Sequence, residues 1–176
     1  MNRVIRKSQT TSVREAADLL AGLFAAELAA PGKCLWLVSP WISDVDLIDN
    51  SAGTFSVLSR FGKRRVRLTE ILVSIASRGC HVVVGTTTAP HNTRFVERLA
   101  LLGADLRIAD RITIAIDPSE HLHTKAITGD DFALSGSMNI TYNGIEVREE
   151  MIQLRLDQKY VAQAKMDAFD RFGGVL

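Results

Sequence analysis

The chain has 176 residues, with 21 lysines and arginines against 20 aspartates and glutamates, so its formal net charge is +1. Hydrophobic residues make up 47% and charged residues 23%, a composition that excludes a disordered chain and fits a folded α/β protein. The length suits one domain, and we expect residues 1–176 to form it. Cys34 and Cys80 are too few and too far apart to predict a disulfide framework or a zinc site.

No apolar run approaches the ~20 residues that a membrane span needs, so no membrane partner is expected. The first residues, MNRVIRKSQTTS, are basic, but Arg14, Glu15 and Asp18 follow before any long apolar stretch. A signal peptide is therefore not expected, which favours the cytoplasm. With a net charge near zero, any polyanionic partner must be met by a local basic patch.

The first half of the chain predicts helices alternating with strands. Leucines and Phe24 recur at helical spacing over residues 19–28 until Pro31 and Gly32, and Ser12 or Thr11 is expected to cap this helix. The short apolar segment 34–38 predicts a buried strand, whereas residues 44–67 have no clear period. The next elements are expected, in order, as helix 69–78, strand 81–85, helix 91–102 and strand 105–109.

The second half predicts a hairpin, a strand and a closing helix. Strands are expected over 123–128 and 132–135, joined by a turn at Gly129, Asp130 and Asp131. A further strand is expected over 151–156 and a helix over 160–172. Together with the first half, this order predicts an α/β sheet.

The most informative stretch is 121–150, which contains His123-x-Lys125, Asp130 after four residues, and then Gly136-Ser137-x-Asn139. With 4 His, 6 Lys and 12 Asp in the chain, the first part of this pattern arises by chance only about 0.01 times. The pattern resembles the HKD signature of the phospholipase D superfamily. Five residues separate Asp130 from Gly136 where the family has six, which we interpret as a shortened hairpin turn.

The residue types suit phosphoryl transfer without a metal. On a strand, positions 123 and 125 point to the same face, so an imidazole and an ammonium are presented together. The ammonium neutralises phosphate oxygens while the imidazole attacks phosphorus, and Ser137 and Asn139 are further donors. This chemistry also needs a carboxylate next to the histidine, because the carboxylate fixes the tautomer of the imidazole.

The resemblance implies the rest of the site. In the family an acidic residue just past G-S-x-N supports the histidine, which points to Glu149, with Glu146 and Glu150 as alternatives. The HKD aspartate is mainly structural there, and that role passes to Asp130. The resemblance also implies a mixed sheet flanked by helices, a phosphohistidine intermediate and no cofactor. Because two histidines are needed and the chain has one motif, a homodimer with a composite active site is expected.

The remaining histidines and the two tryptophans have simpler interpretations. His81 begins a buried strand, His91 is expected at a helix start, and His121 lacks a following lysine. Trp36 lies inside a predicted strand and is expected in the core. Trp41 follows Ser39 and Pro40 at the end of that strand, where α/β proteins open their ligand crevices, so it either stacks on a base or packs at the rim.

A basic segment suggests the substrate. Residues 60–67 hold five cations and no acid, which indicates either a solvated loop or phosphate contacts through Arg64 and Arg65. With the likeness to bacterial phospholipase D-like proteins, this favours a DNA nuclease in a DNA-modification or defence system, with protein partners there. The alternatives are a lipid or small phosphodiester hydrolase and a non-catalytic DNA-binding subunit.

Overall fold

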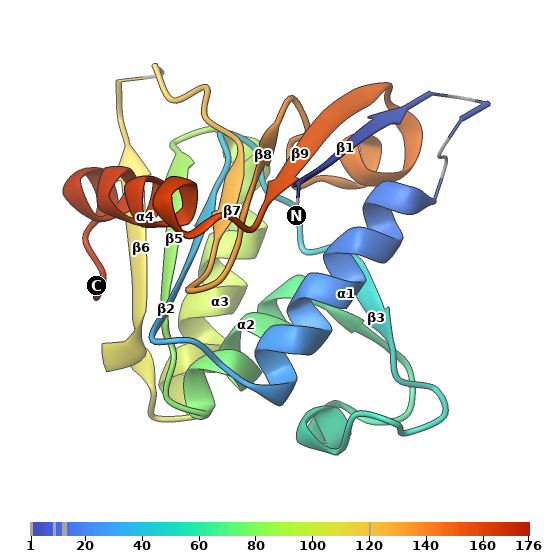
Figure 1. Cartoon of the computed structure of the whole chain (residues 1–176). Coiled ribbons are helices and arrows are strands. Elements are labelled where there is room, and N and C mark those ends of the chain that lie inside the picture. The colour runs from blue at the N-terminus through green and yellow to red at the C-terminus, as the bar shows by residue number, and fades with distance from the viewer. Residues whose placement is uncertain (1, 9, 12–13, 120) are drawn as a thin grey trace.

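The computed structural model describes residues 2–8, 10–11, 14–119 and 121–176. Within these ranges, seven strands form one sheet in the order β1-β9-β8-β7-β2-β5-β6 (Figure 1). Their bounds are β1 (Asn2–Lys7), β2 (Cys34–Val38), β5 (His81–Thr87), β6 (Ile112–Asp117), β7 (Ala126–Thr128), β8 (Ala133–Gly136) and β9 (Glu150–Arg155). A separate pair is formed by β3 (Asp46–Asp49) and β4 (Arg65–Arg67).

The directions of the strands bring distant segments to one edge. Strands β2, β5 and β6 are parallel, whereas β7 is antiparallel to β2 and β8 is antiparallel to β7. Val38 at the end of β2 is paired with Ala126 at the start of β7. The ends of β2, β5 and β8 and the start of β7 therefore share an edge, which we call the carboxyl edge. The opposite edge, where β2 begins, is the amino edge.

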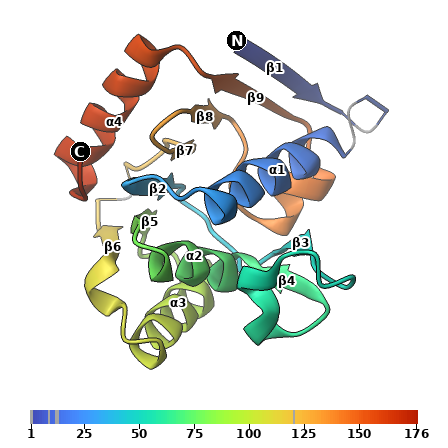
Figure 2. The same cartoon turned by 60° about the horizontal axis from the view of Figure 1, so that its bottom comes forward.

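Helices cover both faces of the sheet (Figure 2). On one face lie α1 (Glu15–Ala29), α2 (Leu68–Ser77) and α3 (Thr93–Asp105), and on the other lies α4 (Gln158–Phe172). All five residues of β2 are buried, as a strand covered on both faces requires. Phe24 of α1 packs in the larger core, whereas Phe169 and Phe172 of α4 pack against Trp36 and Val83.

Most predicted elements are confirmed, with shifts of a few residues. The exception is the strand predicted at 105–109, which is wrong. Helix α3 continues through Gly103 to Asp105, Arg107 adopts a left-handed φ of 56°, and the strand begins only at Ile112. Strands β1, β3 and β4 were not predicted.

Helix α1 begins later than predicted. It starts at Glu15, with Arg14 as the preceding residue and no side-chain cap. Ser12, one of the two predicted caps, lies outside the described residues. None of the helices in the described ranges is long and apolar enough to cross a membrane.

Candidate active site

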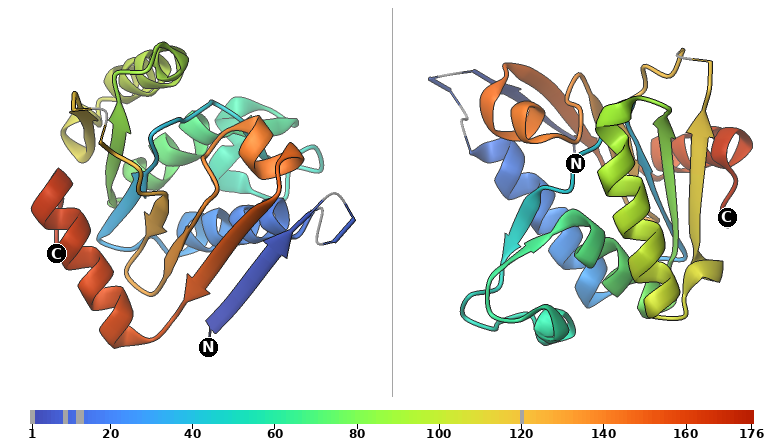
Figure 3. Two further views of the ribbon diagram at one scale, coloured as in Figure 1. Left: turned by 90° about the horizontal axis from the view of Figure 1, so that it is seen from above. Right: turned by 180° about the vertical axis from the view of Figure 1, so that it is seen from behind.

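A pocket of about 470 Å³ opens at the carboxyl edge. The left view of Figure 3 shows the strands of this edge from above. Its lining brings together three sequence regions: the segment after β2, the segment after β5, and the two halves of the HKD-like motif. The lining residues are Pro40, Trp41, Thr87, Thr88, Ala89, Pro90, Leu122, His123, Lys125 and Asn139. His123, Lys125 and Asn139 are thus gathered in one place, as phosphoryl transfer would need.

His123 and Lys125 are not on a strand, contrary to the sequence prediction. Strand β7 begins at Ala126, and the five residues before it belong to no helix or strand. Lys125 still lies beside β8, because its carbonyl accepts a hydrogen bond from the Gly136 amide at 3.2 Å. The Lys125 ammonium donates to the His123 carbonyl at 2.7 Å. Leu122, 1% exposed, anchors the segment from the other side.

Asn139 is held by a buried serine. The Ser39 hydroxyl donates to the Trp41 carbonyl at 2.9 Å and lies 3.2 Å from Asn139 Oδ1, and it accepts from the Ile140 amide at 3.3 Å. Asn139 thus lies against Ser39 and also lines the pocket that holds His123. Sequence reasoning noted Ser39 only as part of a strand end and missed this contact.

A second missed residue is Asn92, which fixes the loop that carries Trp41. Asn92 is 1% exposed; its Oδ1 accepts from the Ile42 amide at 2.9 Å and its Nδ2 donates to the Pro40 carbonyl at 2.8 Å. The loop is thereby tied to the start of α3. Trp41 lies 47% exposed at the mouth of the pocket, whereas Trp36 is 1% exposed in the core, as predicted.

The acidic residue beside the motif is Glu150. Its carboxylate accepts a hydrogen bond from the Ser137 hydroxyl, and that hydroxyl accepts from the Met151 amide at 3.0 Å. Glu149 is exposed. Among the described residues, no hydrogen bond or ion pair joins Glu146, Glu149 or Glu150 to His123, so the acid that supports the histidine stays a prediction.

Gly136 permits the close approach of β8 and β9 that makes this contact. A Cβ at position 136 would lie 2.1 Å from the Met151 carbonyl oxygen, so any other residue would force the strands apart. Ser137 itself is exposed and does not line the pocket that holds His123.

Asp130 lies at the amino edge, away from the pocket. One of its oxygens accepts from the Lys33 amide at 2.6 Å, and the other pairs with the Lys165 ammonium at 2.5 Å. Burial raises the pKa of the Asp130 carboxyl, but these contacts outweigh burial and hold it below its usual value. Asp130 therefore ties the hairpin to α4 and to Lys33, the residue before β2.

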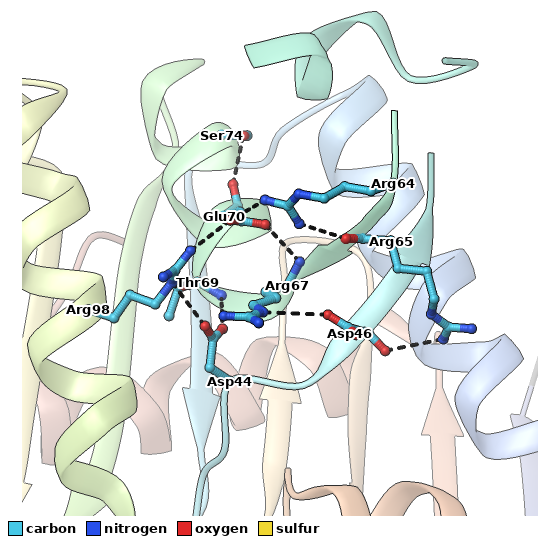
Figure 4. A network of polar contacts seen from close by, with 9 residues as sticks. All are labelled: Asp44, Asp46, Arg64, Arg65, Arg67, Thr69, Glu70, Ser74 and Arg98. Carbon is cyan, nitrogen blue, oxygen red and sulfur yellow. Dashed lines mark hydrogen bonds and ion pairs between the residues drawn. The ribbon is translucent and has the colours of Figure 1, made fainter. Parts of the chain in front are cut away.

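The contacts of three cations of the basic segment, Arg64, Arg65 and Arg67, are shown in Figure 4. Arg64 and Arg98 each pair with the Glu70 carboxylate at 2.7 Å, and Arg98 also pairs with Asp44 at 3.0 Å. Arg64, predicted to bind nucleic acid, instead has its guanidinium on a carboxylate that is 2% exposed. The Arg65 guanidinium donates to the Asp46 carbonyl at 3.4 Å, and its charge interacts with that of Asp49.

The ionisation of Glu70 follows from this network. Burial raises the pKa of its carboxyl, but hydrogen bonds from Arg64 and from the Arg67 amide, with the nearby guanidinium charges, lower it overall. The same hydrogen bond raises the pKa of Arg64. Arg64 therefore belongs to a structural ion-pair network.

The other histidines have partners of their own or stay at the surface. His81 Nε2 lies 2.9 Å from the Thr113 hydroxyl, His91 Nε2 lies 2.7 Å from the Ser43 hydroxyl, and His121 is exposed. Across the described ranges, no group of three or more His, Cys, Asp or Glu side chains is arranged to hold a metal ion. Both cysteines are buried and free.

The sequence matches no protein-family model and no curated protein. The fold does match solved structures. Nuc from Salmonella typhimurium, described as a phospholipase D family member, aligns over 97% of this chain and 93% of its own, with a TM-score of 0.64 and 14% identity. The chain has the phospholipase D fold.

Two further structures show how widely this fold is used. NucT from Helicobacter pylori aligns over 99% of both chains with a TM-score of 0.61 and 15% identity. Phosphatidylserine synthase from Haemophilus influenzae aligns over 95% of this chain and 36% of its own, with a TM-score of 0.59 and 12% identity. The predicted fold is confirmed, and the substrate must be argued from the phospholipase D-like site itself.

Proposed function

We propose that this protein is a metal-independent phosphodiesterase that cleaves nucleic acid, with DNA as its substrate, through a phosphohistidine on His123. The observation that carries the proposal is the convergence of His123, Lys125 and Asn139 in one open pocket at the carboxyl edge of a phospholipase D fold. An imidazole, an ammonium and an amide donor are the groups that covalent phosphoryl transfer requires.

The reaction has two balanced steps. The neutral imidazole of His123 attacks phosphorus, a P–N bond forms, and the bond to the leaving oxygen breaks as that oxygen takes a proton from an acid. Water then attacks the phosphohistidine, loses its proton to the same group, and releases the imidazole. The Lys125 ammonium and the Asn139 amide stabilise the charge on the phosphoryl oxygens in both steps.

The leaving oxygen must take a proton from an acid, and in this scheme a second histidine is that acid. Among the described residues, His123 is the only histidine that lines its pocket. We therefore include in the proposal a symmetric homodimer in which two copies of His123 share one site. Glu150, which lines the neighbouring pocket, and Ser137 act as positioning residues, because their hydrogen bond fixes the segment that leads to Asn139. Glu149 remains the proposed support of the histidine.

Nucleic acid is favoured over lipid by the groups in and near the pocket. Trp41 offers an exposed ring in the pocket itself, and Arg65, in another pocket, has no carboxylate within 4.0 Å in the described ranges. Stacking surfaces and unpaired cations suit bases and phosphates. From the sequence likeness we retain the hypothesis of a cytoplasmic role with protein partners in bacterial DNA modification or defence.

The test compares the wild-type protein with His123→Ala on single-stranded DNA, duplex DNA and phosphatidylcholine vesicles, each with EDTA present. We expect DNA cleavage by the wild type to persist in EDTA, because the residues named above supply the charge stabilisation. Loss of cleavage in chelator, restored by magnesium or zinc, would overturn the mechanism. Cleavage of lipid alone would identify a phospholipase, and DNA binding without turnover would identify a binding subunit.

A further inference from the structure

The pocket that holds His123 is one end of a longer groove. A second pocket of about 450 Å³ shares Trp41 and Asn139 with it, and a third of about 550 Å³ shares Ser43 and Tyr142 with the second. Each volume lies in the range of roughly 300–1,000 Å³ that ligand sites occupy. Because adjoining pockets share lining residues, the three lie side by side, and we call them together the three-pocket groove.

Two exposed aromatic rings stand at the junctions of this groove. Trp41, 47% exposed, separates the first pocket from the second, and Tyr142, 63% exposed, separates the second from the third. Large aromatic side chains usually bury most of their surface, so two exposed rings along one groove need a reason.

The backbone beneath both rings is fixed. Trp41 sits in the loop that Asn92 holds, as described above. Tyr142 precedes a short π-helical turn (Asn143–Val147), and the buried Lys7 ammonium donates to two of its carbonyls, Gly144 at 3.1 Å and Ile145 at 2.6 Å. The two rings are therefore presented in place, which lowers the entropy cost of binding a flexible ligand.

Gly144 links this turn to the active site. A Cβ at position 144 would lie 2.3 Å from the Asn139 carbonyl oxygen, so the turn packs directly on the Asn139 backbone. The placement of Tyr142 is consequently coupled to that of the catalytic amide.

Cations accompany the rings along the groove. Arg148 lines the second pocket, and Arg65 and Arg67 line the third. Arg67 pairs with Asp46 at 3.7 Å, whereas neither Arg65 nor Arg148 has a carboxylate within 4.0 Å in the described ranges.

The acids that line the groove are largely engaged. Asp44 pairs with Arg98, Asp46 pairs with Arg67, and Glu150 accepts from Ser137. Glu146 lies close enough to Lys7 for their charges to interact. The unpaired guanidinium groups therefore remain available to an anionic ligand.

We infer that the three-pocket groove binds single-stranded nucleic acid, with unpaired bases stacked on Trp41 and Tyr142 and backbone phosphates held by Arg148 and Arg65. The inference rests on the proposed function and specifies its substrate. Alternating rings and cations match the alternating bases and phosphates of a single strand. In a duplex the faces of the bases are covered by their neighbours, so the rings would have nothing to stack on.

The test uses binding, measured by fluorescence anisotropy in the His123→Ala background so that no strand is cut. The probes are an oligothymidylate, a strand of equal length that lacks bases, and a duplex of equal length. We expect the oligothymidylate to bind most tightly, because only it offers unpaired bases. The logarithm of its binding constant should fall with the logarithm of salt concentration by roughly 0.7 per phosphate contact.

Ring variants then isolate stacking. Trp41→Leu and Tyr142→Leu should each weaken oligothymidylate binding roughly 5-fold or more and leave binding of the base-free strand nearly unchanged. Tyr142→Phe keeps the ring and should bind as the parent does. Leu101→Ala is the matched control, because Leu101 is 61% exposed on α3 and lies outside the groove. Thermal unfolding of each variant confirms that it is folded.

The inference is overturned if the base-free strand or the duplex binds as tightly as the oligothymidylate, or if the leucine variants bind it like the parent. Hydrolysis of bis(p-nitrophenyl) phosphate and of DNA by the protein with His123 intact separates this from the proposed function. Ring-dependent binding without any hydrolysis would support the groove and refute the catalysis. Cleavage with ring-independent binding would refute the groove alone.

Discussion

The two ends of strand β7 carry parts of the same sequence motif but differ in how far their polar groups are satisfied. At the carboxyl edge, His123 is exposed, and the Lys125 ammonium has only a backbone carbonyl as its described partner. At the amino edge, both oxygens of Asp130 are bound, one to the Lys33 amide and one to the Lys165 ammonium. The polar groups at the carboxyl edge are therefore available to a ligand, whereas the Asp130 carboxylate at the amino edge already has its partners within the chain.

Within one motif, His123 and Lys125 are therefore free to act on a substrate, whereas Asp130 stabilises the fold. A charged group that already has its partners gains little from a substrate, whereas an ammonium held by one carbonyl can exchange that contact for a phosphate oxygen. The three residues of β7 are enough to place the two kinds of group at opposite edges of the sheet. Adjacency in a sequence motif is therefore no guarantee of adjacency in a site.

The largest expected effect is the loss of catalysis at the open end. His123→Ala should lower kcat/KM by about 1,000-fold or more, because the covalent route disappears with the nucleophile. Lys125→Ala should cost about 100-fold or more through lost charge stabilisation. Asp130→Asn should keep most of the activity, measured at a temperature where all three variants are folded. An Asp130→Asn protein that is folded but as inactive as His123→Ala would contradict the division between the two ends.

The same contrast between bound and unbound groups recurs in the basic segment, with a smaller expected effect. Glu70→Ala should lower the free energy of unfolding by about 2 kcal/mol, because Arg64, Arg98 and the Arg67 amide lose a shared partner. Arg65→Ala should change it by less than about 0.5 kcal/mol, as is usual for an exposed side chain. Urea unfolding followed by circular dichroism measures both.

Measurements of single-strand binding test whether Arg65 contacts a phosphate. Arg65→Ala should reduce the salt dependence of single-strand binding by roughly 0.7 in slope, the share of one phosphate contact. Arg60→Ala is the matched control, since Arg60 is exposed in the same segment and lines none of the three pockets of the groove. Equal slopes for the two variants would show that Arg65 makes no phosphate contact.

A pH dependence is expected at the closed end of β7. Because its contacts lower the pKa of Asp130 in the folded protein, the folded state binds a proton less readily than the unfolded chain, whose carboxyl has a pKa of about 3.9. The resulting stabilisation is present above that pH and is lost as the pH falls through the folded-state pKa. Asp130→Asn should therefore be less stable than the wild type by about 1 kcal/mol at neutral pH, and the gap should close in acid.

Asp131→Asn is the control for that experiment, because Asp131 is the exposed neighbour in the same turn. Its stability should follow the wild type across the pH range. A gap between wild type and Asp130→Asn that persists unchanged in acid would show that the carboxylate charge contributes nothing to the fold.

Local sequence patterns were sufficient for the elements whose causes are local. The apolar segment of β2 was located without error, because Gly32 and Pro40 bound a run of buried residues. Strand β1 was missed because its sequence is rich in arginine and lysine. Lys7 is nevertheless buried, where it binds two carbonyls from 137 and 138 residues further along the chain. No periodicity in residues 2–7 reports such a contact.

The residues of the site likewise fall into those with a local sequence signal and those without one. The HKD-like spacing identified His123, Lys125 and Asn139, because family likeness preserves local order. The supports of the site come from far away in the sequence: Ser39 reaches Asn139 across 100 residues, and Asn92 reaches Ile42 across 50. The ion pair of Arg64 with Glu70 was also not predicted, although the two residues are only six positions apart, because it depends on how β4 meets α2.

The smallest effect tests whether the open end is completed by a second chain. With one His123 per chain and a site built from two, a dimer with a single His123→Ala chain lacks either the nucleophile or the acid. After co-refolding of wild type with an equal amount of His123→Ala, about one quarter of the dimers carry two wild-type chains, while the number of dimers has doubled. Activity should therefore fall to about half that of the same wild-type amount alone. A site completed within one chain, for instance by His91 in the adjoining pocket, predicts no fall. Full activity in a mixture shown by mass spectrometry to contain mixed dimers would exclude the shared site, even with His123 essential.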